Sequence, residues 1–236
     1  MSDIVLLAPD DVAFPAPDRA LQQPNGLLAV GGDLTPDWLL TAYAEGIFPW
    51  YENDEGPILW WSPDPRAVVT PGGLHISRSL ARRIRNCGFN VTMDNSFSEV
   101  VAQCAAPRRS GPGTWITPRM QSAYTQLHRL GYAHSVEVWM GEQLVGGLYG
   151  VSLGLMFFAE SMFFKERDAS KIALHRLSRQ LECWRFTLID CQVMNEHLRS
   201  LGVIDMPRST FLGLVRANEL GATRRGPWRL EASHAG

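Results

Sequence analysis

The chain has 236 residues, of which 45% are hydrophobic and 19% are charged, and its formal net charge is −2. This composition excludes a disordered chain and leaves room for one large domain or two smaller ones. The small net charge excludes a uniformly basic nucleic-acid-binding protein, so any surface for nucleic acid must be local.

The sequence carries no pattern of export or membrane insertion. Residues 1–8 have an acid where a signal peptide requires a cation, and the longest uncharged run, 143–159, is shorter than a membrane span. The four cysteines form no CxxC pair, and no histidine and cysteine spacing resembles a zinc site. We therefore expect a cytoplasmic protein with reduced thiols, no metal and no membrane contact.

Residues 1–62 are predicted to form a small N-terminal domain, because they are rich in Pro, Gly and Trp. A helix is predicted from Thr35, a hydroxyl N-cap that is followed by proline and an acid, to Gly46. The aromatic runs 48–51 and 60–61 either fill a small core or offer a flat stacking surface.

Residues 63–236 are predicted to form the main domain, which opens with a short strand at 67–70. Residues 77–86 predict a basic helix, whose surface is either a site for a polyanion or an ordinary solvated face. Its arginines are Arg78, Arg82, Arg83 and Arg85.

The next segment alternates short strands and helices. A strand is predicted at 89–93, and Ser96 with Glu99 has the capping-box spacing that opens a helix to about residue 104. A Gly- and Pro-rich loop ends at Trp115, either an anchor in the core or a lid over a site. A further helix is predicted over 117–131.

Three strands follow, at 134–139, 143–149 and 153–159, and then a helix at 169–183 and a strand at 186–192. Antiparallel strands followed by a helix and one more strand predict an α+β domain. This order resembles the core of the GCN5-type acetyltransferase fold, which says little about the substrate.

Two of these strands run from apolar residues into a carboxylate, Glu160 and Asp190. A charge at the end of an apolar strand is costly unless it is paired or used, so these acids predict a site at a shared edge. Alternation predicts that Glu160 and Met162 share one face, and that Asp190 and Gln192 share one face with Cys191 opposite. The alternative is that Asp190 and Gln192 only cap the strand end in a turn.

Two nucleophile motifs are rejected. Residues 150–154 match GxSxG, but the apolar run that follows predicts a hairpin, and a nucleophile elbow requires a helix there. Cys191 is rejected because alternation turns it away from Asp190.

Ten motifs, taken in order along the chain, together resemble leucyl/phenylalanyl-tRNA–protein transferases. They are PNGLLAVGGD at 24–33, GIFPW at 46–50, LWWSPDPR at 59–66, HISRS at 75–79, GTWIT at 113–117, HSVEVW at 134–139, LVGGLYG at 144–150, ESMF at 160–163, ASK at 169–171 and LIDCQ at 188–192. The resemblance covers nearly the whole chain.

The resemblance implies an α+β fold in which a small N-terminal domain, 1–62, precedes an acetyltransferase-like catalytic domain, 63–236. It implies transfer of Leu or Phe, and Met less well, from aminoacyl-tRNA to a protein that begins with Arg or Lys. The new N-terminus marks that protein for degradation. The implied enzyme is a cytoplasmic monomer that needs no ATP, metal or organic cofactor.

The resemblance also carries roles onto single positions. Asp190 and Gln192 match the catalytic pair, and Glu160 matches the acid near the acceptor's amino terminus. The positions that match the donor pocket are Trp50, Trp115, Phe157, Ala159, Met162, Leu174 and Ile189. Those that match the tRNA-binding cluster are Arg78, Arg82 and Arg83. The chain departs from the family pattern at Leu148, Phe164, Asp168 and Leu177.

From these residues we expect Asp190 to polarise Gln192, whose amide oxygen orients the attacking amine. Glutamine is too weak a base to hold a proton, so a relay or a water is also expected. Two rivals stay open. An acyl-CoA N-acetyltransferase needs a pyrophosphate-binding glycine loop, which is not found at 164–168. A non-catalytic RNA-binding or degradation adaptor would not need Asp190 or Gln192.

Overall fold

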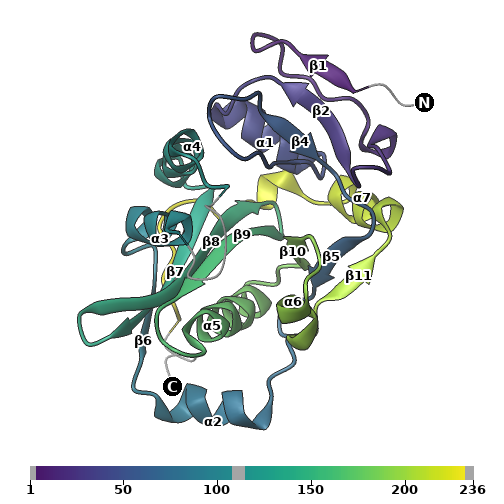
Figure 1. Ribbon diagram of the computed structural model, residues 1–236. Helices are drawn as coiled ribbons and strands as arrows, with labels where there is room; N and C mark the ends of the chain where they lie inside the picture. The colour runs from purple at the N-terminus through teal and green to yellow at the C-terminus, as the bar shows by residue number, and fades with distance from the viewer. Residues whose placement is uncertain (1–3, 108–114, 232–236) are drawn as a thin grey trace.

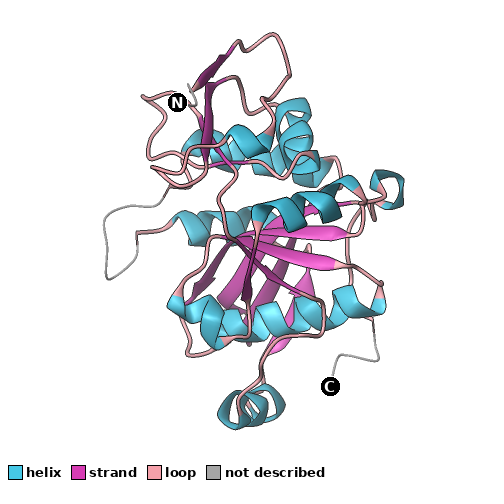
Figure 2. Cartoon of the chain, turned by 90° about the vertical axis from the view of Figure 1, so that its right-hand side faces the viewer, coloured by secondary structure: helices cyan, strands magenta, loops and turns pink. Residues whose placement is uncertain are grey.

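The computed structural model describes residues 4–107 and 115–231. These residues form an α+β structure built on two sheets, which confirms the predicted fold class (Figure 1). The smaller sheet lies at the N-terminal end of the molecule, and the larger sheet lies below it with helices on both faces (Figure 2).

The smaller sheet has four strands in the order β1-β2-β4-β3. Their bounds are Val5–Leu7 for β1, Leu27–Gly31 for β2, Phe48–Pro49 for β3 and Leu59–Trp61 for β4. Helix α1, Pro36–Ala44, begins where the sequence predicts, and a short 3-10 turn, Pro17–Arg19, lies between β1 and β2. Trp38 and Trp60 stack at 5.9 Å and are fully buried, so most of the dense aromatics fill a core.

The larger sheet has seven strands in the order β11-β5-β10-β9-β8-β7-β6. Only β9 and β10 pair in parallel, and the other neighbours are antiparallel. The bounds are Arg66–Val69 for β5, Asn90–Met93 for β6, Ala133–Met140 for β7, Gln143–Leu153 for β8, Met156–Phe164 for β9, Leu188–Gln192 for β10 and Ile204–Met206 for β11.

Six helices belong to this larger unit. They are α2 (Arg78–Asn86), α3 (Phe97–Ala105), α4 (Pro118–Arg129), α5 (Ala169–Cys183), α6 (Glu196–Ser200) and α7 (Arg208–Arg216), and a 3-10 turn follows at Leu220–Ala222. Helices α3 and α4 pack on one face of the sheet and α5 packs on the other (Figure 2). Helix α7 returns to the small sheet, where Phe211 and Leu212 lie against Gly46.

Two local expectations differ from the structure. Strand β9 does not end at Glu160 but continues to Phe164, so Glu160 lies within the strand. The side chain of Ser96 makes no capping hydrogen bond, and its backbone N–H donates to Glu137 and not to Glu99. The hairpin at 154–155 places Ser152 inside β8, which agrees with rejection of the nucleophile elbow. The domain boundary at 62 stays a prediction, since one core cluster contains residues from both sides of it.

Two irregularities shape the middle of the large sheet. The pairing of β9 with β10 stops at Phe158 and Asp190, although β9 runs on for six more residues. A bulge in β9 leaves Glu160 without a partner on β8, because Tyr149 pairs with Ser161 and Gly150 with Ala159. Bulges re-aim side chains, and this one lies where the two strands part.

Candidate active site

Asp190 is fully buried on β10 and is held by one arginine. The Nε of Arg66 donates to Oδ1 at 2.8 Å, and a terminal nitrogen donates to Oδ2 at 2.6 Å. The same guanidinium lies between the rings of Phe48 and Phe211, at 4.7 and 4.6 Å, and donates to the carbonyl of Gly46. A planar fork that lies over two aromatic rings and is bonded along its edge has one orientation. Asp190 is therefore fixed in place.

Glu160 is buried above this pair, on the face of the sheet that α3 and α4 cover. The hydroxyl of Tyr43, from α1, donates to Oε1 at 2.7 Å, and that of Tyr124, from α4, donates to Oε2 at 2.8 Å. The two hydroxyls also lie 2.7 Å apart. Glu160 thus joins α1, α4 and β9 in one polar network inside the core.

Gln192 links the two carboxylates. Its backbone N–H donates to Asp190 Oδ1 at 2.9 Å, and its side-chain Nε2 donates to Glu160 Oε1 at 2.8 Å. Its φ of 64° is rare for a residue other than glycine, and such strain is found where surrounding contacts impose it. Gln192 thus forms the turn at the end of β10 and also brings the two carboxylates together, so the two alternatives for the end of this strand are both present.

Burial dominates the electrostatics of Glu160. Desolvation raises the pKa of its carboxyl to about 7, against the hydrogen bonds from Tyr43 and Tyr124, which lower it. The charge of Asp190 also contributes to the rise and that of Arg66 opposes it, and the pKa of about 7 is the net result. A carboxyl with a pKa near neutrality can exchange a proton at physiological pH.

Successive side chains alternate between the two faces of the sheet along β10, as predicted, but not along β9. Cys191 lies in the core cluster on the α5 face, away from Asp190, and burial raises the pKa of its thiol, so it is no nucleophile. Met162, however, packs on that same α5 face opposite Leu148, while Glu160 faces α1 and α4. The expectation that Glu160 and Met162 share a face is wrong, because the bulge inserts one residue between them.

The seven residues predicted to line a donor pocket fall into two groups. Phe157, Leu174 and Ile189 are fully buried in the core cluster against α5, with Ala159 and Met162 half-buried at its margin. Trp115 packs at the margin of the other cluster, and Trp50 is 44% exposed beside Trp61.

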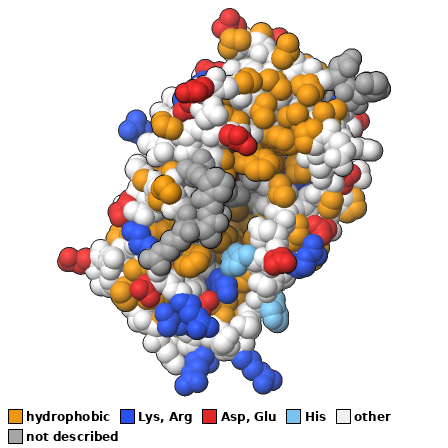
Figure 3. All heavy atoms as spheres, in the orientation of Figure 1, with side chains coloured by type: hydrophobic (Ala, Val, Ile, Leu, Met, Phe, Trp, Pro, Cys, Tyr) orange, Lys and Arg blue, Asp and Glu red, His pale blue; other side chains and the backbone are white. Residues whose placement is uncertain are grey.

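The three predicted tRNA-binding arginines lie on α2, at the end of the molecule opposite the small sheet. Lys and Arg side chains gather there on the face shown in Figure 3. Arg78 and Arg82 are exposed. Arg83 is half-buried with its guanidinium 5.5 Å from the ring of Phe89, so it also anchors the helix.

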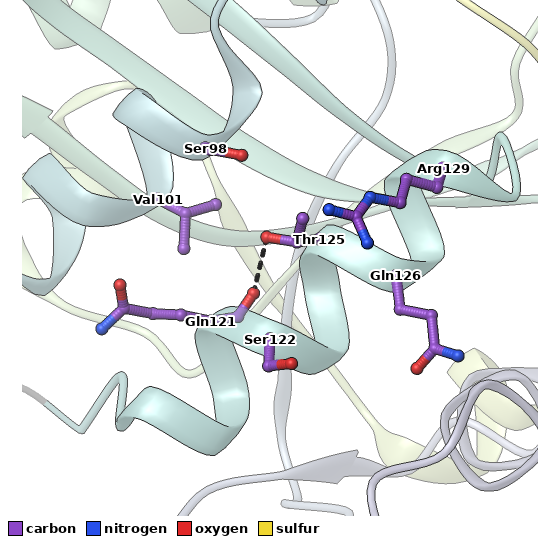
Figure 4. A pocket seen from close by; sticks show the side chains of 7 residues that line it. All are labelled: Ser98, Val101, Gln121, Ser122, Thr125, Gln126 and Arg129. Carbon is purple, nitrogen blue, oxygen red and sulfur yellow. Dashed lines mark hydrogen bonds between the residues drawn. The ribbon is translucent and has the colours of Figure 1, made fainter.

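A polar groove of about 320 Å³ lies elsewhere, between α3 and α4 (Figure 4). It is lined by Ser98, Val101, Gln121, Ser122, Thr125, Gln126 and Arg129, and it includes none of the predicted site residues. Across 4–107 and 115–231, no three acidic, histidine or cysteine side chains are grouped to hold a metal. No helix in the same ranges is long and apolar enough to cross a membrane.

Sequence reasoning missed Arg66, Tyr43 and Tyr124. Tyr43 reads as one more apolar residue of an amphipathic helix, and Tyr124 gives no sign in its own helix. Arg66 does offer a signal, since it opens the apolar strand 66–69 and a buried arginine requires an acid. The buried acid it pairs with is Asp190.

The chain matches two family models. One, described as leucyl/phenylalanyl-tRNA protein transferase, matches residues 68–216, and the other, the N-terminal domain of the same family, matches residues 32–64. A leucyl/phenylalanyl-tRNA–protein transferase of Anaeromyxobacter sp. (strain Fw109-5) is 56% identical over 225 residues, 95% of this chain and 94% of that protein. One from Pseudomonas fluorescens (strain SBW25) is 52% identical over 219 residues, 93% and 96% of the two chains.

Solved structures match less closely. A GCN5-related N-acetyltransferase from Kribbella flavida overlaps with a TM-score of 0.39 and 10% identity, over 73% of this chain and 61% of that one. The structure of L-PGS from Bacillus licheniformis overlaps with a TM-score of 0.39 and 12% identity, over 66% and 50%.

Proposed function

Because the chain belongs to the leucyl/phenylalanyl-tRNA–protein transferase family, it is an aminoacyltransferase whose substrates are a tRNA and a protein, and we propose that it transfers Leu or Phe, and Met less well, to an N-terminal Arg or Lys. The residue added then marks the acceptor protein for degradation. The enzyme works in the cytoplasm as a monomer and without a cofactor.

The arrangement of Gln192 between two buried carboxylates carries this proposal. The donor is an ester and the product is an amide, so the reaction needs no external energy source. The acceptor's neutral α-amine attacks the ester carbonyl carbon, a C–N bond forms, and the C–O bond to the ribose breaks. The proton that nitrogen loses after the attack ends on the ribose oxygen.

Gln192 orients the amine in this mechanism. Its Nε2 is held by Glu160, and its Oε1 accepts no hydrogen bond from any residue the structure describes, so it is available to the amine. Asp190 bonds to the backbone of Gln192 and not to its side chain. Asp190 therefore sets the position of Gln192, and Glu160, in place of Asp190, polarises the side-chain amide. Orientation of this kind supplies most of the acceleration.

The donor side chain is selected on the α5 face of the sheet. A slot without room beside Cβ accepts Leu and Phe and rejects β-branched Ile and Val, because their χ1 angles are stiff. One misplaced methyl group costs only about 1–3 kcal/mol, so the selection is finite. The tRNA is held through its phosphates by Arg78, Arg82 and Arg83.

The test is transfer of labelled Leu from Leu-tRNA to a peptide that begins with Arg, without ATP or CoA. A peptide that begins with Glu is the matched control. Transfer to the Arg peptide alone is the expected result. Retained tRNA binding without any transfer would favour an RNA-binding adaptor, and dependence on an acyl-CoA would favour an acetyltransferase.

A further inference from the structure

Glu160 closes a ring of three oxygen contacts inside the core. Tyr43 lies 2.7 Å from Oε1, Tyr124 lies 2.8 Å from Oε2, and the two hydroxyl oxygens lie 2.7 Å apart. Both tyrosines are fully buried. All three distances are those of good O–H···O hydrogen bonds.

The ring has one proton too few when Glu160 is ionised. Three contacts require three protons, each tyrosine supplies one, and a carboxylate supplies none. Gln192 does not make up the difference, since its Nε2 donates to Oε1 from outside the ring. The three bonds are complete only when Glu160 carries a proton, so the ring is built to receive one.

The ionised carboxylate also has limited room for a ligand. A carboxylate offers about four acceptor positions. Oε1 already accepts from Tyr43 and Gln192, and Oε2 accepts from Tyr124. One position, on Oε2, is left among the residues that the structure describes. It suits a single N–H of an ammonium group and not the two parallel bonds of a guanidinium.

We propose that Glu160 binds the acceptor's α-amino group through this position and accepts its proton, which the ring with Tyr43 and Tyr124 then stores. The inference rests on the proposed function. The ammonium loses one proton to Glu160 and becomes the neutral amine that attacks the ester. Glu160 later releases that proton to solvent, which restores the carboxylate for the next acceptor.

The surroundings of Glu160 support this role. The titratable and charged groups that face it are Tyr43 on α1, Tyr124 on α4, Tyr149 on β8, Asp190 on β10 and Arg66 on β5. Burial and these groups together raise the pKa of Glu160 to about 7. This pKa lies close to that of an ordinary α-amino group, about 7.7–8.0. Transfer of a proton between groups of such similar pKa is nearly balanced.

One consequence concerns specificity. If Glu160 takes the α-amino group, the cationic side chain of the acceptor's first residue is recognised by other groups. Loss of Glu160 should then weaken transfer to peptides that begin with Arg and with Lys by the same factor.

The test compares pH profiles of kcat/KM for an Arg-initiated peptide in the native protein, E160Q, Y124F and Y149F. In the native protein, kcat/KM rises with pH and the midpoint of the rise lies near pH 7. In E160Q, kcat falls by about 10²–10⁴-fold, and the rate follows the acceptor's own α-amino titration, so the deficit shrinks as the pH rises. Y124F takes one hydrogen bond away from the carboxylate and opens the ring, so its midpoint moves away from the native value.

Y149F is the matched control, because the Tyr149 hydroxyl is buried beside the ring and accepts or donates no bond within the described residues. Its midpoint stays at the native value. An E160Q variant with native kcat and a raised KM would overturn the inference, as would a native midpoint in Y124F.

A second readout does not depend on transfer. Infrared difference spectroscopy of the protein alone follows the carboxylic acid C=O stretch, which should disappear with a midpoint near pH 7 in the native protein and be absent in E160Q. Its absence from the native protein would also overturn the inference. A native protein that titrates as expected but transfers nothing would contradict the proposed function instead.

Discussion

Arg66 holds both carboxylate oxygens of Asp190 in a pair that is almost wholly shielded from water. The pair joins the first strand of the large sheet to the strand that carries Gln192. A buried pair of this kind contributes little net stability, but removal of one partner leaves a buried charge without compensation.

Arg66→Met should therefore destabilise the protein by about 3–5 kcal/mol. The double variant R66M/D190L removes both charges and should regain most of that loss, yet stay inactive in transfer because Gln192 has lost its anchor. Urea unfolding of the two variants beside the native protein measures the difference. A double variant that is less stable than R66M would contradict this account.

The raised pKa of Glu160 makes stability depend on pH. Between its ordinary value of 4.5 and about 7, the native state binds the proton that the unfolded state releases. The free energy of unfolding should thus fall as the pH rises through this window, by about 3 kcal/mol. Urea unfolding at pH 5 and pH 8 measures it. E160Q should lose this pH dependence, and an equal fall in both proteins would assign it to other groups.

Arg82→Ala should weaken the binding of every tRNA by a similar factor. One lost phosphate contact should reduce the slope of log affinity against log salt concentration by about 1. Filter binding or fluorescence anisotropy at several salt concentrations measures the slope. Arg129→Ala, in the groove between α3 and α4, removes an exposed arginine far from α2 in sequence and is the control. A tRNA affinity that does not change with salt concentration would contradict binding through phosphate contacts.

Met162→Ala should change the ranking of donors more than the stability. Met162 is half-buried at the margin of the α5-face cluster, so its truncation widens the predicted slot and should favour Phe over Leu by up to about 1–3 kcal/mol. Competition between Leu-tRNA and Phe-tRNA measures the ratio. Leu174→Ala, which truncates a fully buried residue, should instead cost about 2–5 kcal/mol of stability. An unchanged ratio in M162A would place the donor elsewhere.

Much of the architecture could be predicted from local signals. Thr35 followed by proline marks the start of α1, and Thr117 caps α4 through its side chain as its position suggests. Asp190 and Gln192 could be predicted as site candidates because acid and amide groups are costly to place at the end of an apolar strand unless they are paired or used. Their shared face and the opposite direction of Cys191 follow from the period of a strand.

The rest depends on contacts between distant segments. Alternation assumes an unbroken strand, so the bulge at Glu160 could not be predicted, and with it the direction of Met162. In the network around Glu160, Tyr43 bonds to Tyr124, which lies 81 positions later in the chain, and to Glu160, which lies 117 positions later. No local pattern distinguishes a tyrosine whose hydroxyl meets a buried acid from one that only fills space.

The stacking of Arg66 between Phe48 and Phe211 bears on when the enzyme first becomes active. Phe48 and Arg66 come from the first third of the chain, whereas Phe211 lies on α7, the last α-helix of the described residues. While residues 208–216 of a nascent chain are still inside the ribosome, Phe211 cannot pack against Arg66, the residue that fixes Asp190. The ribosome is surrounded by aminoacyl-tRNA, and an incomplete chain tethered there would lack the fixed Asp190 that transfer requires.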